Sequence, residues 1–165
     1  MNISNAEAKL ELALIDSKAN ELDRIDFISR LTNANLPQEV VFRLEELWEA
    51  THVIGKKVVH TGKIIIFDIL RFIEDNPHLA MGVALGAAVG ALVSLIPFLG
   101  SLLAPLATAM GIVVGGLAGA RLDRDLKVEK GSIGIAQELI ILAKKFFEFL
   151  AAIFIALKVD FTNEV

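Results

Sequence analysis

The sequence predicts an all-α membrane protein built around one glycine-faced transmembrane helical hairpin that is flanked by amphipathic helices. Two observations lead to this fold class. Residues 79–120 contain no charged side chain. The whole chain of 165 residues is 55% hydrophobic, with a mean hydropathy of +0.61, whereas a typical soluble domain is about 45–50% apolar. We therefore expect the lipid bilayer to be the main partner of the chain.

The small residues of this uncharged segment are arranged as a mirror. Three glycines stand four residues apart in its first half and three in its second. In an antiparallel hairpin, two residues that are equally far from the turn lie side by side. Small residues therefore meet wherever the two helices touch, which lets the helices approach closely in lipid. The pattern predicts a glycine zipper within the chain, with contacts between chains as a second use of the same faces. The mirror pairs are Gly82 with Gly119, Gly86 with Gly115, Gly90 with Gly111, and Ser94 with Ala107.

Residues 1–52 are predicted to form a small polar helical module outside the lipid. Ser4 and Glu7 fit a capping box that opens an amphipathic helix. Residues 20–31 have the apolar spacing of a second helix, and Pro37 is placed to open a third. The apolar faces of these helices must pack against each other, against the rest of the chain or against a partner.

Negative charge is concentrated in this module, because residues 1–50 carry five Lys or Arg against ten Asp or Glu. Glu45, Glu46 and Glu49 stand close to Trp48. They form either a docking face for a basic protein partner or a solvated helix face, and the second reading is favoured. No concentrated basic face occurs, so no nucleic-acid partner is expected.

Residues 53–76 are predicted to form an amphipathic helix that is apolar over most of its circumference. Such a helix lies in a membrane interface or packs against other apolar helices. Asp68 stands among isoleucines and is costly in lipid. We expect it to pair with Lys63 or Arg71, or to line a water-filled lumen. The narrow polar stripe of this helix consists of Thr61, Asp68 and Asp75.

Residues 77–121 are the predicted transmembrane hairpin. Its two arms, 78–96 and 104–121, are each close to the roughly 20 residues that cross a bilayer core. Lys and Arg flank the hairpin on both sides whereas the turn is uncharged, so both termini are expected in the cytoplasm, at the inner membrane of a bacterium. The turn region contains Pro97, Gly100 and Ser101, and Pro105 marks the start of the second arm.

Residues 122–165 are predicted to comprise a linker and a long, nearly apolar helix over 133–157. Lys144 and Glu148 have the spacing of a helical ion pair. Charges in the middle of this helix leave open whether it crosses the membrane or lies on it, and whether they are paired or line a lumen. The charged residues that share one side of the helix are Glu138, Lys144, Lys145 and Glu148.

The sequence contains no pattern that predicts an enzyme, a cofactor or a metal site. Cysteine is absent, which removes disulfides and thiolate chemistry. Neither a phosphate-binding glycine loop nor a zinc-binding histidine motif occurs. His52, His60 and His78 are expected at the surface or the membrane interface.

The uncharged helical pair at residues 78–121, set between amphipathic helices, resembles the hydrophobic hairpin of pore-forming colicins and the glycine-zipper hairpins of small bacterial membrane proteins. The resemblance covers these residues only and rests on the pattern. The chain departs from colicin channel domains in having fewer amphipathic helices to cover the hairpin.

These observations predict an integral membrane protein that forms homo-oligomers and acts on the membrane by pore formation, permeabilisation or a related assembly. A soluble bundle that covers the hairpin and inserts it later is an alternative form of this hypothesis. A second hypothesis is a membrane-anchored scaffold or adaptor that recruits a partner through residues 1–52. A subunit of a larger transport or secretion assembly is a third.

Overall fold

The computed structural model describes residues 1–77, 81–111 and 130–161, with side chains for 1–77, 82–111 and 137–161. Within these ranges the chain forms seven helices and one two-stranded hairpin. The mostly helical fold that the sequence predicts is confirmed. Among the described residues, no helix is both long enough and apolar enough to cross a membrane.

The N-terminal helices are α1 (Asn5–Glu21), α2 (Arg24–Asn33) and α3 (Gln38–Trp48). The predicted capping box is present, because the Ser4 hydroxyl accepts from the Glu7 N–H, while the Ser4 N–H donates to the Glu7 carboxylate at 2.9 Å. The second helix begins later than predicted because a carboxylate caps it there, a strong helix start signal. That cap is Asp23, whose carboxylate accepts from the N–H of Asp26 at 2.8 Å, whereas Pro37 occupies the N-cap position of α3 without a side-chain hydrogen bond.

Residues 52–59 form an antiparallel β-hairpin, where the sequence predicted the beginning of the amphipathic helix. Strand β1 (His52–Ile54) pairs with β2 (Lys57–Val59) through a two-residue turn. Gly55 adopts φ +67°, which tight hairpin turns require, and the β-branched residues around it favour strands. The helical interpretation was wrong here because the local turn chemistry overrides the apolar pattern. The register pairs His52 with Val59, Val53 with Val58 and Ile54 with Lys57.

Helix α4 (Thr61–Asp75) follows the hairpin directly and begins in close contact with the end of α3. A methyl group at Gly62 would overlap the carbonyl oxygen of Leu47. The Gly62 N–H also donates to the carbonyl of Ala50 at 3.1 Å. Because no larger residue fits this approach, Gly62 fixes where α4 starts relative to α3.

Helices α5 (Met81–Leu95) and α6 (Gly100–Ala109) stand where two equal hairpin arms were predicted. Helix α6 begins inside the predicted turn and contains Pro105 in its interior. It ends early because Gly111 adopts φ +69° and its N–H donates to the Thr108 carbonyl at 2.9 Å, a helix-terminating turn. The rest of the second arm, 112–121, lies outside the described residues.

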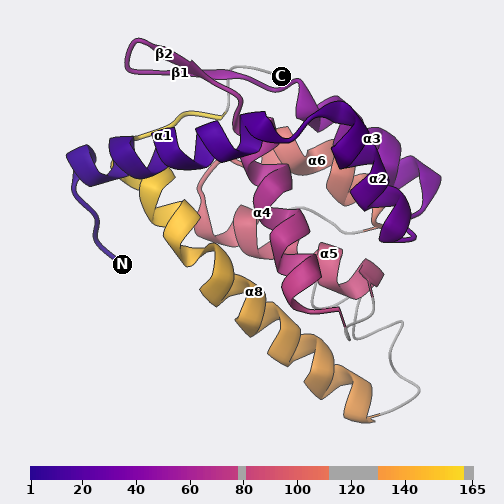
Figure 1. The fold of residues 1–165 in the computed structure, drawn as a ribbon. Coiled ribbons are helices and arrows are strands. Elements are labelled where there is room, and N and C mark those ends of the chain that lie inside the picture. The colour runs from indigo at the N-terminus through magenta and orange to yellow at the C-terminus, as the bar shows by residue number, and fades with distance from the viewer. Residues whose placement is uncertain (78–80, 112–129, 162–165) are drawn as a thin grey trace.

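Helix α5 lies in the interior of the molecule, between α4 and α8 (Lys130–Ala156) (Figure 1). The long helix α8 makes the most extensive contact with α5, and α1 crosses both α4 and α8. Helix α6 packs mainly against α3 and less against α5. The chain therefore encloses its most apolar helix in a layer of amphipathic ones.

Candidate functional site

The candidate functional site is α5 together with the helices that cover it. This helix carries no charge, and most of its side chains are removed from solvent. Gly86 is buried as well, Gly90 is half-buried, and Gly82 and Ser94 are exposed. The buried side chains of α5 are Ala84, Leu85, Ala87, Ala88, Val89, Ala91 and Leu92.

Apolar contacts alone hold α5 in place among the described residues. The one side-chain hydrogen bond that it makes there runs from the Ser94 hydroxyl to the Ala91 carbonyl, at 3.0 Å, and stays within the helix. Apolar burial is non-directional and depends on area rather than on a particular partner. Moving α5 from this interior into lipid would therefore break no directed polar contact that holds it here.

The predicted glycine mirror is only partly within the described residues. Gly115 and Gly119 lie outside them, so the pairs with Gly86 and Gly82 stay predictions. Gly111, expected inside a helix, instead follows the end of α6 in an exposed turn. Ala107 is buried in α6.

The chain that leaves α5 presents an aromatic side chain to solvent. Phe98 is 69% exposed and has φ +67°, a conformation that non-glycine residues seldom adopt. It lines a groove of about 400 Å³ whose other side comes from the end of α8 and the residues after it. Lys158, in the same groove, has φ +52°. Such backbone strain is concentrated at functional positions, and here it accompanies an exposed apolar tip.

Ser101 links the first turn of α6 to the segment that follows α8. Its hydroxyl donates to the carbonyl of Phe161 at 2.7 Å. Pro97 is exposed and Gly100 is half-buried at the same end of the bundle. The predicted turn residues thus lie at the surface, beside the residues that follow α8.

The polar stripe predicted for α4 faces partly into the bundle. Thr61 is buried, and its hydroxyl makes no hydrogen bond within the described part of the chain. Asp68 is 7% exposed, whereas Asp75 is exposed. A continuous solvent-facing stripe on α4 is therefore not present in this structure.

Arg71, not Lys63, is the partner of Asp68. An Arg71 guanidinium nitrogen lies 3.6 Å from an Asp68 carboxylate oxygen. Burial raises the pKa of Asp68 to about 6, and the charge of Arg71 offsets part of that rise. Lys63 instead places its ammonium 4.6 Å from the ring centre of Trp48. Arg71 is half exposed and its guanidinium also lies against the ring of Phe146 in α8.

The predicted charges of α8 all lie on its exposed side. Glu148 is 3.5 Å from the N-terminal ammonium of Met1, so its partner in the described residues is not Lys144. Glu138, Lys144 and Lys145 are exposed as well. The outer face of α8 thus carries two lysines at its centre.

Asp16 is a buried charge that the sequence reasoning did not single out. It is 4% exposed in α1, accepts from the His60 N–H at 3.3 Å and lies 3.7 Å from the Lys57 ammonium. It fastens α1 to the β-hairpin and the start of α4. The signal for it is an acid on the same helical face as Leu12 and Ala19, which are also buried.

The two histidines that the structure describes are His52 and His60. His52 is buried, against expectation, and meets the ring of Phe161 edge-on at 5.1 Å. His60 is half-buried at the end of the hairpin, and His78 lies outside the described residues. In the ranges that the structure describes, no cluster of three or more His, Asp or Glu side chains is suited to hold a metal ion.

Comparison of the chain with family models, with curated proteins and with solved structures gives no significant match in any of the three.

Proposed function

We propose that this protein acts on membranes, and that the bundle described above is the state in which its apolar segment is covered. In the bilayer, residues 78–121 form the glycine-faced hairpin that the mirror pattern predicts. The chain then assembles as a homo-oligomer and permeabilises the membrane. The proposed location is the inner membrane of a bacterium, with both termini in the cytoplasm. No reaction is assigned to the chain.

The observation that carries this proposal is that α5 has the uncharged sequence of a membrane segment but lies in the interior of a helical bundle. An uncharged helix is enclosed by helices whose outer faces are charged, and apolar contacts alone hold it within the described residues. Lipid replaces apolar contacts without requiring new polar partners, provided that the helix keeps its own backbone hydrogen bonds. The two environments therefore suit the same helix.

The exposed tip gives the segment a place to meet the bilayer first. Phe98 and Pro97 project where α5 ends, and an exposed Phe side chain can enter the boundary between headgroups and acyl chains. Lys158 lines the same groove and can hold a lipid phosphate as a point charge. In our proposal this end of the bundle binds the bilayer first, and α5 leaves the bundle afterwards.

The test is leakage of a trapped dye from phospholipid vesicles, with two variants that carry equal charge. Ser94 and Thr108 are exposed in the bundle but belong to the segment that must enter lipid. S94D/T108D should fold and bind vesicles at the surface, yet leak at least about tenfold more slowly. Each added carboxylate must pass the centre of the bilayer to reach the far side, where a charge costs about 3 kcal/mol.

The matched control is S29D/T32D, which adds the same two charges on the exposed face of α2. Thr32 and Thr108 even make the same bond, each hydroxyl donating to the carbonyl four residues earlier at 2.9 Å. The control should leak like the unmodified chain. Equal leakage by both variants would show that the segment does not enter the bilayer.

The topology after insertion can be measured by labelling single introduced cysteines, because the chain contains no cysteine of its own. After insertion into sealed inner-membrane vesicles or cells, a cysteine at Ser101 should react with an impermeant reagent on the far side. Cysteines at Ser4 or Ser132 should react only on the cytoplasmic side. Far-side labelling at Ser132 would contradict the two-crossing hairpin.

A scaffold that recruits a protein through residues 1–52 is the second candidate. Its support is the apolar surface of that module, where Ile25 is 79% and Phe42 is 53% exposed. An anchor of this kind binds vesicles without releasing dye. Binding without leakage, by folded protein, therefore selects the scaffold over the permeabilising protein.

A further inference from the structure

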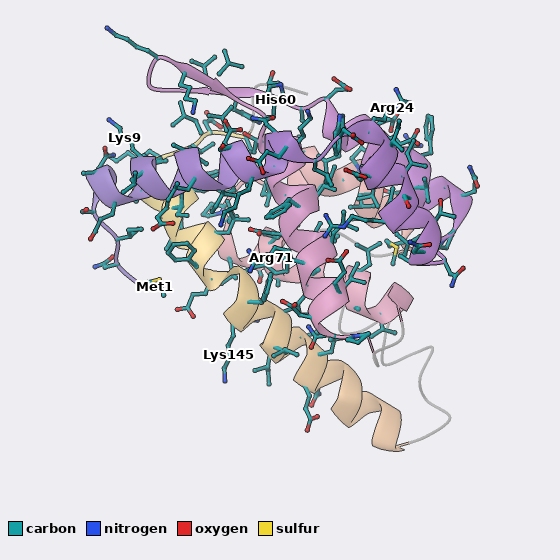
Figure 2. The ribbon with its side chains drawn as sticks, in the orientation of Figure 1. Met1, Lys9, Arg24, His60, Arg71 and Lys145 are labelled. Carbon is teal, nitrogen blue, oxygen red and sulfur yellow. The ribbon has the colours of Figure 1, made fainter. Side chains whose placement is uncertain are left out.

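Two exposed faces of the bundle carry opposite charges, and both contain exposed apolar side chains. The first is a groove between α2 and α3, and the second is the outer side of α8. In Figure 2, Arg24 beside the groove and Lys145 on α8 point away from the bundle in opposite directions. Because the two faces point in opposite directions on one folded chain, they can meet only between neighbouring chains.

The groove has aromatic walls and an acidic rim. It encloses about 240 Å³, and its floor is the stacked pair of Phe27 and Trp48, whose ring centres are 4.5 Å apart. Phe42 projects from its edge. The remaining lining residues are Arg24, Glu45, Glu46 and Glu49.

The charge of this groove is negative and only partly neutralised. Glu46 is 2.8 Å from Arg43, whereas Glu45 and Glu49 have no ion pair within the described residues. Among the described residues that line the groove, Arg24 is the only cation, and the Lys63 ammonium lies 4.6 Å from the ring centre of Trp48. A cationic and apolar surface is therefore the partner that this groove fits.

The outer side of α8 has that character. Four large apolar side chains are exposed on it, and Lys144 and Lys145 stand between them without an ion pair in the described part of the chain. Two acids share this side of the helix: Glu138 precedes the apolar residues, and Glu148, between Lys145 and Phe149 in the sequence, lies 3.5 Å from the N-terminal ammonium. The exposed apolar residues are Ile141, Leu142, Phe149 and Ile155.

We propose that the outer face of α8 in one copy docks into the α2–α3 groove of the next copy, so that the chain associates head to tail. Such a heterologous contact uses different surfaces on the two partners and closes into a ring or extends as a filament. The proposal rests on the homo-oligomer of the proposed function and adds to it a contact between chains in the covered state, before α5 is released. It concerns the folded bundle and is tested without lipid, so its failure is separate from a failure to permeabilise vesicles.

The experiment is sedimentation velocity of the full chain over a range of concentrations, at low and at high salt. The unmodified protein should associate as concentration rises, and less so in high salt, because the interface joins opposite charges. K144E/K145E places like charges in contact and should weaken association at least about tenfold. A chain that stays monomeric throughout would overturn the proposal.

Two further variants make the result specific. K9E/K18E changes the net charge equally on the exposed side of α1 and should associate like the unmodified chain. E45K/E49K/K144E/K145E keeps the original net charge, exchanges the signs of the two faces and should restore association. Equal weakening by K9E/K18E, or no restoration in the fourfold variant, would show that the lysines of α8 do not meet this groove. Circular dichroism confirms that each variant is folded.

Discussion

Helices α4 and α5 are packed against each other and have the same length of 15 residues, but they are held in different ways. Helix α4 is fixed to its neighbours by polar and steric contacts at several points: Gly62 against Leu47 of α3, Glu74 with Arg30 of α2, and Arg71 over the ring of Phe146 in α8. Helix α5 has apolar packing only, in the described residues. Directed contacts specify one position for a helix, whereas apolar burial does not. Helix α5 is therefore the one of the two that can leave the bundle.

The largest effect is expected from removing the apolar packing on which α5 depends. Leu85 is fully buried, so Leu85→Ala should lower the free energy of unfolding by about 2–5 kcal/mol, through lost burial and the cavity left behind. Urea unfolding followed by circular dichroism measures this. A loss below about 1 kcal/mol would mean that α5 is loosely packed and that the comparison with α4 fails.

The buried acid of α4 should make stability depend on pH. An unfolded Asp ionises near pH 4, whereas folded Asp68, with its pKa raised to about 6, keeps its proton until higher pH. Between these values the unfolded state releases a proton that the folded state holds, so stability falls as pH rises, by roughly 2–3 kcal/mol in total. Asp68→Asn lacks this loss.

Unfolding of both proteins at several pH values between 4 and 7 checks this expectation. Relative to the unmodified chain, Asp68→Asn should become more stable as pH rises through this range and level off above pH 6. If the difference in the free energy of unfolding between the two proteins does not change with pH, Asp68 is more solvated than its burial in α4 indicates.

The close approach of α4 to α3 predicts an intermediate effect. Gly62→Ala forces the added methyl group against the Leu47 carbonyl, and the backbone must shift to relieve the overlap. Such overpacking typically costs about 1–3 kcal/mol. Gly82→Ala is the control on α5, because an added methyl group there meets no atom of the described residues within 4 Å, and it should be neutral or stabilising. Equal losses at both sites would contradict the steric role of Gly62.

The smallest effect concerns the ion pair that fastens α4 to α2. Arg30 and Glu74 form two parallel hydrogen bonds of 2.7 and 2.6 Å, but Glu74 is half exposed. Arg30→Gln should therefore cost less than about 1 kcal/mol, and less still in high salt. A decrease in the free energy of unfolding above 2 kcal/mol would show that this pair contributes more to holding α4 against α2 than its solvent exposure indicates.

Local signals in the sequence determined several elements of this protein. The capping box at Ser4, the helix opened after Pro37 and the uncharged helix now seen as α5 follow from neighbouring residues, since caps and apolar runs act within one or two turns. The importance of Asp68 was also visible, because one acid among isoleucines is conspicuous wherever it lies.

Only the tertiary structure decided the partners of these elements. The sequence offered two equal arms, but Gly111 ends α6 in a turn, and α8 rather than α6 makes the main contact with α5. It likewise allowed either Lys63 or Arg71 beside Asp68, and the packing of α3 draws Lys63 to Trp48. The physical reason is the same in each case: apolar faces and single charges have many suitable partners, and the choice among them depends on how distant segments pack together.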